Sequence, residues 1–506
     1  MSNDSPVESE AIAQDPGDPG LRRAAAGGVM WQGLSYFLGK ALVLVSTAIL
    51  ARLLTVEEFG LVGLALVFIT YAEVLTDLGV AQALVYFPRT DRRIDSAVAL
   101  SLVSSLALVG AALLAAPYVA DYFDEPEVTG LFRLLSLSLF LGGLGQVPDA
   151  LIRKELRFKN RLIMDLLRAV GQGAVSIGLA VAGYGAVAIV WGYLAGNLLR
   201  TAAAWVLVDH RPRLSFGALR GEEAGPLLRY GVAAAGNGLL LSLVFNIDYL
   251  IVGKVLGTDA LGFYALAFRL PQMAIINVFH VLSSVAFPLF SKARDDHGKL
   301  VRGYLTSVRI QTVFGVGAGV LLAVVAPSLV EVVFGVPKWS PSIVPLQALA
   351  LYASFRSLGI GAVDLYKGIG RPGLALGSSV VRLAVLLPAL LVATDWGIEG
   401  VSWAQAGVAL ALAAMMQIVA ARVLSLSVVD LAGALWPSLA VGVAAFGGAG
   451  AVHMWLPGPA VARLAFASLA GLVCGWAALW LTDKKLLTEL RQMTRRGPAT
   501  GLSPTV

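Results

Sequence analysis

The sequence predicts an all-α polytopic membrane protein with about fourteen transmembrane helices, and three observations indicate that class. First, 58% of the 506 residues are hydrophobic and only 14% are charged, whereas about a quarter of the residues in a soluble domain are charged. Second, apolar stretches of about 20 residues, the length that a membrane helix needs, recur from Gly27 to Leu481. Third, the 55 glycines spread through these stretches, which is typical of membrane helices and not of short alternating β-barrel strands.

Charged residues and Pro/Gly positions divide the apolar sequence into fourteen candidate helices. In chain order they cover 27–51, 60–87, 95–118, 128–150, 162–182, 186–208, 230–256, 260–290, 304–328, 341–366, 373–393, 398–421, 432–452 and 460–482. The segments between them are no longer than about 25 residues, which leaves no room for an inserted soluble catalytic domain.

The distribution of basic residues predicts the orientation of the spans. With a cytoplasmic N-terminus, the inner segments carry 26 Lys and Arg residues and the outer loops carry four. Positively charged residues concentrate in short cytoplasmic loops, so we expect both termini to be cytoplasmic. The loop over 121–127 has four acidic residues and no basic one, and we expect it on the outer side.

An internal repeat predicts two lobes. Residues 52–65, RLLTVEEFGLVGLA, align without gaps on residues 254–267, KVLGTDALGFYALA, at an offset of 202. The alignment pairs Arg52 with Lys254, Leu54 with Leu256, Glu57 with Asp259, and Gly60 with Gly262. This offset, and that of a second, shorter match, corresponds to six spans, so the halves should share one orientation, as in parallel-repeat transporters. The alternative is convergence of two outer turns on Gly and acidic caps.

The repeat and the spans together predict the organisation of the chain. We expect a disordered cytoplasmic tail at 1–26, an N-lobe of six helices at 27–208, a cytoplasmic inter-lobe linker at 209–229, a C-lobe of six helices at 230–421, two accessory helices at 422–482 and a cytoplasmic tail at 483–506. The first 20 residues are acidic and contain Pro and Gly, a composition typical of disorder and not of a signal peptide.

Eight basic residues fall inside the predicted spans, where they are expensive unless they face water, partner acids or the interior of the bundle. They are Lys40, Arg133, Arg168, Arg200, Arg269, Arg309, Arg356 and Arg382. Guanidinium groups bind phosphate through paired hydrogen bonds, so we predict that Arg269, Arg309, Arg356 and Arg382, with Lys40 and Arg168, form a cationic cavity for an anionic headgroup. The alternatives are snorkelling at a span end, for Arg133 and Arg200, and a local ion pair with Asp165, for Arg168.

Three acidic residues inside the spans are candidates for ion coupling. Glu73 and Asp77 are four residues apart on one helix, and Asp248 lies near Asn246 on another. An acid shielded from water can carry a proton, and carboxylate and amide oxygens can hold Na⁺. A structural salt bridge, for example with Lys40, is an equal alternative, so the coupling ion stays open between H⁺, Na⁺ and none.

Several other classes of chemistry are not predicted. The single cysteine, Cys474, lies inside an apolar stretch, and the four histidines are far apart, so we expect neither a metal site nor a cofactor. The basic run RKELRFKNR at 153–161 is explained by a cytoplasmic position that meets anionic membrane lipids, and we expect no nucleic-acid partner. The stretch GLSYFLGKA at 33–41 fails the spacing of a nucleotide-binding loop.

Several strings resemble those of one family. ILARLLTVEEFGLVGLALVF, LTDLGVAQALV, PDALIRKELRFKNR, NIDYLIVGKVLGTDALGFYALAFRL, GIGRPGLAL and WGIEGVSWAQA look like those of Wzx-type, colanic-acid-exporter-like oligosaccharide flippases of the multidrug/oligosaccharidyl-lipid/polysaccharide (MOP) exporter superfamily. The resemblance covers about residues 25–430. It implies two lobes in a V around a cationic cavity, in a bacterial inner membrane.

The resemblance also implies a cargo of undecaprenyl-diphosphate-linked oligosaccharide for surface polysaccharides such as lipopolysaccharide, and polysaccharide polymerase machinery as a partner. Asp248, Lys254 and Arg269 fall in the longest of the resembling strings. Two other functions remain open. A multidrug or cation antiporter of the same superfamily would need acids and aromatic residues facing the cavity, and a membrane-embedded polymerase or ligase would need an extended outer loop. We therefore expect a transporter and not an enzyme.

Overall fold

The computed structural model describes residues 38–486 apart from 77, 88–89, 156, 210–222 and 485. The predicted N-terminal tail, most of the linker and nearly all of the C-terminal tail lie outside the described residues. All the regular elements in the described part are helices, so the predicted all-α class is confirmed.

The first half of the chain contains a helix over 38–53 followed by α2 to α7. Their bounds are α2 Val56–Leu75, α3 Val80–Tyr86, α4 Asp91–Phe123, α5 Val128–Lys154, α6 Phe158–Val181 and α7 Ala186–Leu207. Helix α2 begins with a capping box, in which the Thr55 side chain accepts from the backbone N–H of Glu58 and the Glu58 carboxylate accepts from that of Thr55. This cap defines the turn between the first two helices.

The second half begins with α8, a long helix, and continues to α16. The bounds are α8 Ala224–Leu256, α9 Thr258–Pro271, α10 Asn277–Ala293, α11 His297–Val333, α12 Ile343–Gly368, α13 Pro372–Ala393, α14 Gly397–Val423, α15 Val428–Trp455 and α16 Ala460–Thr482. Helix α8 begins inside the range predicted as a linker, so the last residues of that range are helical.

Two of the predicted spans are interrupted. The span over 60–87 divides into α2 and α3, because the backbone is left-handed at Leu78 and Gly79 (φ 47° and 71°). The span over 260–290 contains a π-helical turn, Gln272–Ile276, directly after Pro271. Proline lacks the N–H that continues an α-helix, which explains why the helical pattern changes there.

Twelve described helical stretches are long and apolar enough to cross a membrane. One of them, Pro372–Val423, includes both α13 and α14, which are joined by a 3₁₀ turn at Thr394–Trp396. Of the predicted span over 27–51, the structure describes residues 38–51. The count of fourteen therefore stays a prediction.

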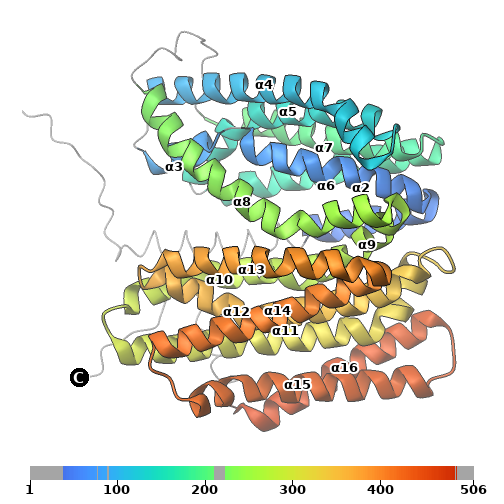
Figure 1. The fold of residues 1–506 in the computed structure, drawn as a ribbon, viewed down its shortest axis with the longest axis vertical. Coiled ribbons are helices and arrows are strands. Elements are labelled where there is room, and N and C mark those ends of the chain that lie inside the picture. The colour runs from blue at the N-terminus through green and yellow to red at the C-terminus, as the bar shows by residue number, and fades with distance from the viewer. Residues whose placement is uncertain are drawn as a thin grey trace, which may run out of the picture.

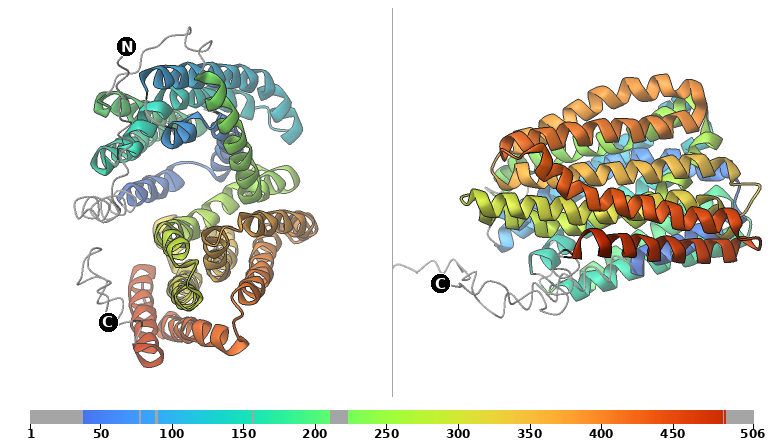
Figure 2. Two further views of the ribbon diagram at one scale, coloured as in Figure 1. Left: turned by 90° about the vertical axis from the view of Figure 1, so that its left-hand side faces the viewer. Right: turned by 90° about the horizontal axis from the view of Figure 1, so that it is seen from below.

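The helices form two groups with an accessory pair at one edge. In Figure 1, α2 to α7 lie in the upper group and α9 to α14 in the lower group, while α8 runs obliquely from the first to the second. Helices α15 and α16 pack on each other and on α11 at the lower edge (Figures 1 and 2). We call the two groups the N-lobe and the C-lobe, and this arrangement agrees with the predicted two lobes plus two helices.

The lobes meet at one end of the bundle, where α2 packs against α8 and α9. The largest hydrophobic cluster crosses this boundary, since it includes Leu64 and Phe132 of the N-lobe together with Tyr264, Phe268 and Tyr352 of the C-lobe. Of two smaller clusters, one packs helices of the C-lobe together, and the other packs N-lobe helices against Leu227 at the start of α8. Apolar packing therefore joins the lobes where α9 begins and holds each lobe together elsewhere.

Candidate functional site

Two of the predicted arginines meet in the C-lobe. Arg356 of α12 and Arg382 of α13 both donate hydrogen bonds to the Tyr352 hydroxyl, from Nη1 at 3.0 Å and from Nη2 at 2.9 Å. Both guanidinium carbons also lie near the ring of Phe245 on α8, at 4.4 and 4.8 Å from its centroid. We call Arg356 and Arg382 the arginine pair. The π-face of an aromatic ring stabilises a cation without neutralising it.

The geometry of the helices explains this arrangement. Tyr352 and Arg356 are one turn apart on α12, so they share a face. Within the described residues, no carboxylate lies within ion-pair distance of Arg356 or Arg382. The pair therefore keeps its positive charge and N–H donors beyond those that Tyr352 uses.

Asp248 lies one turn along α8 from Phe245 and is almost completely buried, with 1% of its surface exposed. Its Oδ2 accepts hydrogen bonds from the Tyr264 hydroxyl at 2.6 Å and from Nε2 of Gln405 at 2.9 Å. Its Oδ1 has no hydrogen-bond partner among the described residues. Arg382 lies within electrostatic range of this carboxylate, so Asp248 belongs to the same site as the arginine pair.

A second group of basic residues contains members from both halves of the chain. Lys40, from the helix over 38–53, lies within electrostatic range of Arg168 on α6 and Arg269 on α9. Arg269 in turn acts on Tyr249 of α8, the neighbour of Asp248. We call Lys40, Arg168 and Arg269 the inter-lobe basic group. The group therefore extends from Lys40 and Arg168 in the first half of the chain to Arg269, which lies near Asp248.

Glu73 lies in the N-lobe beside this group. Its Oε1 accepts a hydrogen bond of 2.7 Å from the hydroxyl of Tyr193, and the charges of Arg168 and Arg200 act on it. The guanidinium of Arg168 also lies over the ring of Tyr193, 5.5 Å from its centroid. Asp77, the other acid predicted on this helix, lies outside the described residues.

Arg309 is separated from the other predicted arginines. Its Nη1 forms an ion pair of 2.9 Å with Oδ2 of Asp483, a buried residue directly after α16. This contact fastens α11 to the accessory helices. Of the four arginines predicted to converge, only Arg356 and Arg382 therefore share a site, and Arg269 lies on the neighbouring helix α9. The sequence contained no indication of the partner, because Asp483 is 174 positions away in the chain.

Asp165, the predicted local partner of Arg168, pairs with Arg200 instead. Asp165 lies 3.6 Å from Nε of Arg200 on α7, and Arg200 also lies 3.4 Å from Asp149. Two carboxylates therefore share Arg200, while Arg168 turns to Tyr193. The sequence predicts snorkelling at a span end for Arg200, whereas the structure pairs it with acids of two other helices.

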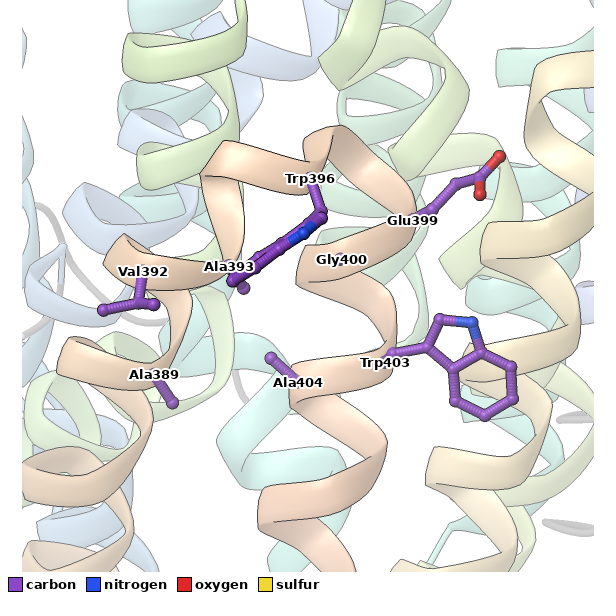
Figure 3. Close-up of a pocket in the computed structure, with 8 residues that line it drawn as sticks. All are labelled: Ala389, Val392, Ala393, Trp396, Glu399, Gly400, Trp403 and Ala404. Atoms are coloured by element: carbon purple, nitrogen blue, oxygen red, sulfur yellow. The ribbon is translucent and has the colours of Figure 1, made fainter.

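A shallow pocket lies apart from these groups, between the end of α13 and the start of α14. Figure 3 shows Trp396 between the two helices, with Trp403 and Glu399 pointing to the other side of α14. Trp396 and Trp403 are exposed, and exposed tryptophans are common where membrane helices meet the lipid headgroups. This pocket therefore fits a position in the aromatic belt.

This chain is similar to known proteins both in sequence and in fold. A model of a family described as polysaccharide biosynthesis protein matches residues 49–344, more than half of the chain. The chain belongs to this family.

Two curated relatives cover most of the chain. The lipopolysaccharide biosynthesis protein WzxC of Escherichia coli K12 is 26% identical over 376 residues, which is 74% of this chain and 75% of WzxC. The teichuronic acid biosynthesis protein TuaB of Bacillus subtilis 168 is 25% identical over 359 residues, 69% of this chain and 73% of TuaB. Together with the apolar helices, these similarities establish that this family member is a multi-pass membrane protein.

Solved structures show the same fold. The lipid II flippase MurJ in an inward closed conformation aligns with a TM-score of 0.64 at 12% identity, covering 91% of this chain and all of MurJ. An inward-facing multidrug resistance MATE family transporter of the MOP superfamily aligns with a TM-score of 0.57 at 17% identity, covering 80% of this chain and 94% of the other. At these identities the likeness concerns the fold alone.

Proposed function

We propose that this family member is a flippase, which moves undecaprenyl-diphosphate-linked oligosaccharide repeat units from the cytoplasmic to the outer leaflet of a bacterial inner membrane for surface polysaccharide synthesis. The single observation that carries the proposal is the arginine pair, which is held between Phe245 and Tyr352 without a carboxylate partner among the described residues. Planar guanidinium groups suit the oxygen atoms of a diphosphate. The relatives named for polysaccharide biosynthesis support the same class of cargo.

The mechanism follows from the charges and from the two lobes. The inter-lobe basic group draws the anionic headgroup between the lobes, since a positive region raises the local concentration of an anion. The arginine pair then binds the diphosphate, while the lipid tail stays in the bilayer. Separation of the lobes at their common end, with closure at the opposite end, exposes the headgroup to the other side.

Asp248 and Glu73 are the proposed ion-coupling groups. Each is an acid inside the bundle that accepts a hydrogen bond from a tyrosine hydroxyl. A proton or Na⁺ that binds Asp248 would remove the attraction between that carboxylate and Arg382. Polysaccharide polymerase machinery would take up the product on the outer side.

The test is a deletion in the bacterial host together with reconstitution. Deletion should abolish the surface glycan and cause its lipid-linked repeat to accumulate in the cytoplasmic leaflet. The full chain in proteoliposomes should move a fluorescent undecaprenyl-diphosphate glycan between leaflets. Normal surface glycan in the deletion strain and no flipping in proteoliposomes would contradict the proposal.

A second function, a cation or multidrug antiporter, is favoured by one observation. The Oδ1 atom of Asp248 is buried without a partner among the described residues, and such an oxygen can bind a cationic substrate. The same proteoliposomes separate the two functions. Proton-driven uptake of a cationic dye without lipid flipping would support the antiporter.

A further inference from the structure

Two basic residues that correspond in the internal repeat make the same contact in opposite directions. Arg52, at the end of the helix over 38–53, donates from Nε to the carbonyl of Val333 at 3.1 Å and from Nη2 to that of Val332. These carbonyls belong to the last turn of α11 in the C-lobe. Arg52 therefore reaches from the N-lobe to the C-terminal end of a C-lobe helix.

Lys254, at the offset of 202, reaches in the other direction. It lies near the end of α8 and donates from Nζ to the carbonyl of Tyr122 and to Oδ2 of Asp124, the latter at 3.1 Å. Tyr122 is in the last turn of α4 in the N-lobe, and Asp124 is its C-cap. The last carbonyls of a helix lack partners within the helix and carry its negative dipole end, so a cation stabilises them.

The helices that receive these cations also end alike. Helix α4 is followed by Asp124 with φ 59°, and α11 is followed, after one residue, by Gly335 with φ 95°. The sequences at these ends, FDEP at 123–126 and FGVP at 334–337, match at the Phe and Pro positions. The repeat therefore includes the helix ends that accept the hydrogen bonds, on α4 and α11, as well as the residues that donate them, Arg52 and Lys254.

The two lobes also approach each other closely between these contacts. A Cβ atom on Gly60 of α2 would lie 1.9 Å from the carbonyl oxygen of Thr258, and one on Gly262 of α9 would lie 2.5 Å from that of Val56. Gly60 and Gly262 also correspond in the repeat. Glycine at both positions lets the starts of α2 and α9 touch backbone to backbone.

A lysine and a tryptophan close the same region from the C-lobe. Lys338 donates from Nζ to the carbonyls of Ala51, at 2.9 Å, and Leu54, and Nε1 of Trp339 donates to the Ala51 carbonyl at 2.8 Å. The centroid of the buried Trp339 ring lies 5.4 Å from that of Phe59 and 5.9 Å from that of Phe263. The end of the first described helix is therefore held by the C-lobe, just as that helix holds α11.

We propose that these contacts form a latch that closes the two lobes at their common end and must open in each transport cycle. The lobe latch consists of Arg52, Lys254, Lys338, Trp339, Gly60 and Gly262. Its direction rests on the proposed function and on the predicted topology, which place this end on the outer side. Arg52 and Lys254 are partly exposed and bind backbone carbonyls, so water can replace them when the lobes separate. The latch thus sets the equilibrium between the conformation in which the lobes are closed at this end and the conformation in which they are separated, and it does so through side chains of the protein alone.

The test uses the accessibility of a residue under the latch. Leu261 is fully buried and lies beside Gly253 of α8 and Gly63 of α2. In the full chain carrying Cys474→Ser and Leu261→Cys, in lipid nanodiscs without cargo, a water-soluble maleimide should react slowly. Arg52→Gln and Lys254→Gln should each accelerate labelling several-fold, and the double variant should accelerate it further.

The matched control is Arg463→Gln. Arg463 pairs with Glu331 at 3.1 Å near the same end of α11, but both residues lie in the second half of the chain. This variant should label at the parent rate. Arg52→Lys and Lys254→Arg, which keep the charge, should restore slow labelling and thereby exclude misfolding as the cause.

Two outcomes would overturn the latch: parent-rate labelling in the double glutamine variant, or equal acceleration in Arg463→Gln. Because the measurement needs no cargo, it is independent of the proposed function. Failure of the parent protein to flip lipid-linked glycan would contradict the flippase and leave the latch standing.

Discussion

At the scale of single residues, the arginines inside the bundle are held in two ways. Arg200 and Arg309 meet aspartates, which cancel their charge. Arg356 and Arg382 meet a hydroxyl and an aromatic ring, which leave the charge in place and N–H donors available. The charged arginine pair can therefore bind an anion, whereas the neutralised arginines, Arg200 and Arg309, hold helices together.

Replacing Arg382 by glutamine should weaken cargo binding. The variant removes one guanidinium from Phe245 and Tyr352 and leaves Arg356 alone, so we expect at least a tenfold loss of affinity for an undecaprenyl-diphosphate probe, in line with about 1.5–3 kcal/mol for a charged hydrogen bond. Titration of the purified protein with the probe measures this. Arg309→Gln is the control, because it breaks a distant ion pair; equal losses in both variants would refute the assignment.

Asp248→Asn should separate coupling from binding. Asparagine keeps an oxygen that can accept from Tyr264 and Gln405 but cannot carry the charge, so gradient-driven flipping should decrease while probe binding changes little. Flipping in proteoliposomes with and without proton and Na⁺ gradients measures the effect, and Glu73→Gln is tested alongside. If collapsing both gradients leaves the parent rate unchanged, these acids are counter-ions to the buried cations.

At the scale of helices, small residues decide how closely neighbours pack. Helix α11 crosses α12 at Gly319, where a Cβ atom would lie 1.9 Å from Oγ of Ser354 and 2.6 Å from the carbonyl oxygen of Ala350. Membrane helices associate through such close contacts, because lipid offers no hydrophobic gain for their association. The spacing of α11 and α12 in turn bears on the arginine pair, since Tyr352 and Arg356 lie on α12.

Gly319→Ala should destabilise the C-lobe. The new methyl group needs α11 and α12 to move apart, and overpacking of this kind costs about 1–3 kcal/mol. Thermal unfolding in detergent should show a lower midpoint. Gly407→Ala is the matched control, because nothing lies within 4 Å of a Cβ atom there; an equal decrease in that variant would contradict the packing argument.

The start of α11 should respond to acid. Asp296 caps this helix by accepting a hydrogen bond of 2.9 Å from the backbone N–H of Lys299, and that bond, with the Lys299 ammonium, holds the pKa of the carboxyl below its usual range. A lowered pKa means that the cap stabilises the helix above the unfolded-state pKa and is lost as the pH falls through the folded-state value. Hydrogen exchange of the first turn should therefore be faster in Asp296→Ala than in the parent at neutral pH. The difference should shrink at strongly acidic pH; a constant difference would show that the charge is irrelevant.

At the scale of the whole molecule, the two lobes share one end and one internal symmetry. The hydrophobic cluster that crosses the lobes lies where α2 meets α9, and the pairs that form the lobe latch correspond in the repeat. A duplicated six-helix unit therefore produces its own latch, because each copy supplies both a cation and a helix end. If ion gradients prove irrelevant, removal of the product by polymerisation on the outer side would still drive net flipping.

The predicted orientation can be tested by labelling from outside. In a Cys474→Ser background, cysteine at Asp124 should react with an impermeant maleimide added to intact cells, whereas cysteine at Lys159 should react only after permeabilisation. Both positions are exposed, so burial does not confuse the result. The opposite pattern would reverse the topology and the proposed direction of transport.

The sequence by itself determined the helical class and the two-lobe repeat. These properties follow from local hydrophobicity and helical length, which each segment carries in its own residues. Helical spacing also predicts that Tyr352 shares a face with Arg356, and Phe245 with Asp248, although the sequence analysis had not singled out these aromatic residues.

Only the tertiary structure decided the partners. Arg309 faces Asp483 and Arg382 faces Phe245 because of the angles and offsets at which distant helices pack, and nothing in the spacing along one helix encodes them. The break at Leu78 and Gly79 likewise involves a neighbouring helix, because Gly79 lies against the backbone of Gly231 on α8. The candidate site was therefore predicted as a set of residue types, while its division into a charged pair, a neutralised arginine and a cross-lobe group arose from packing between segments far apart in the chain.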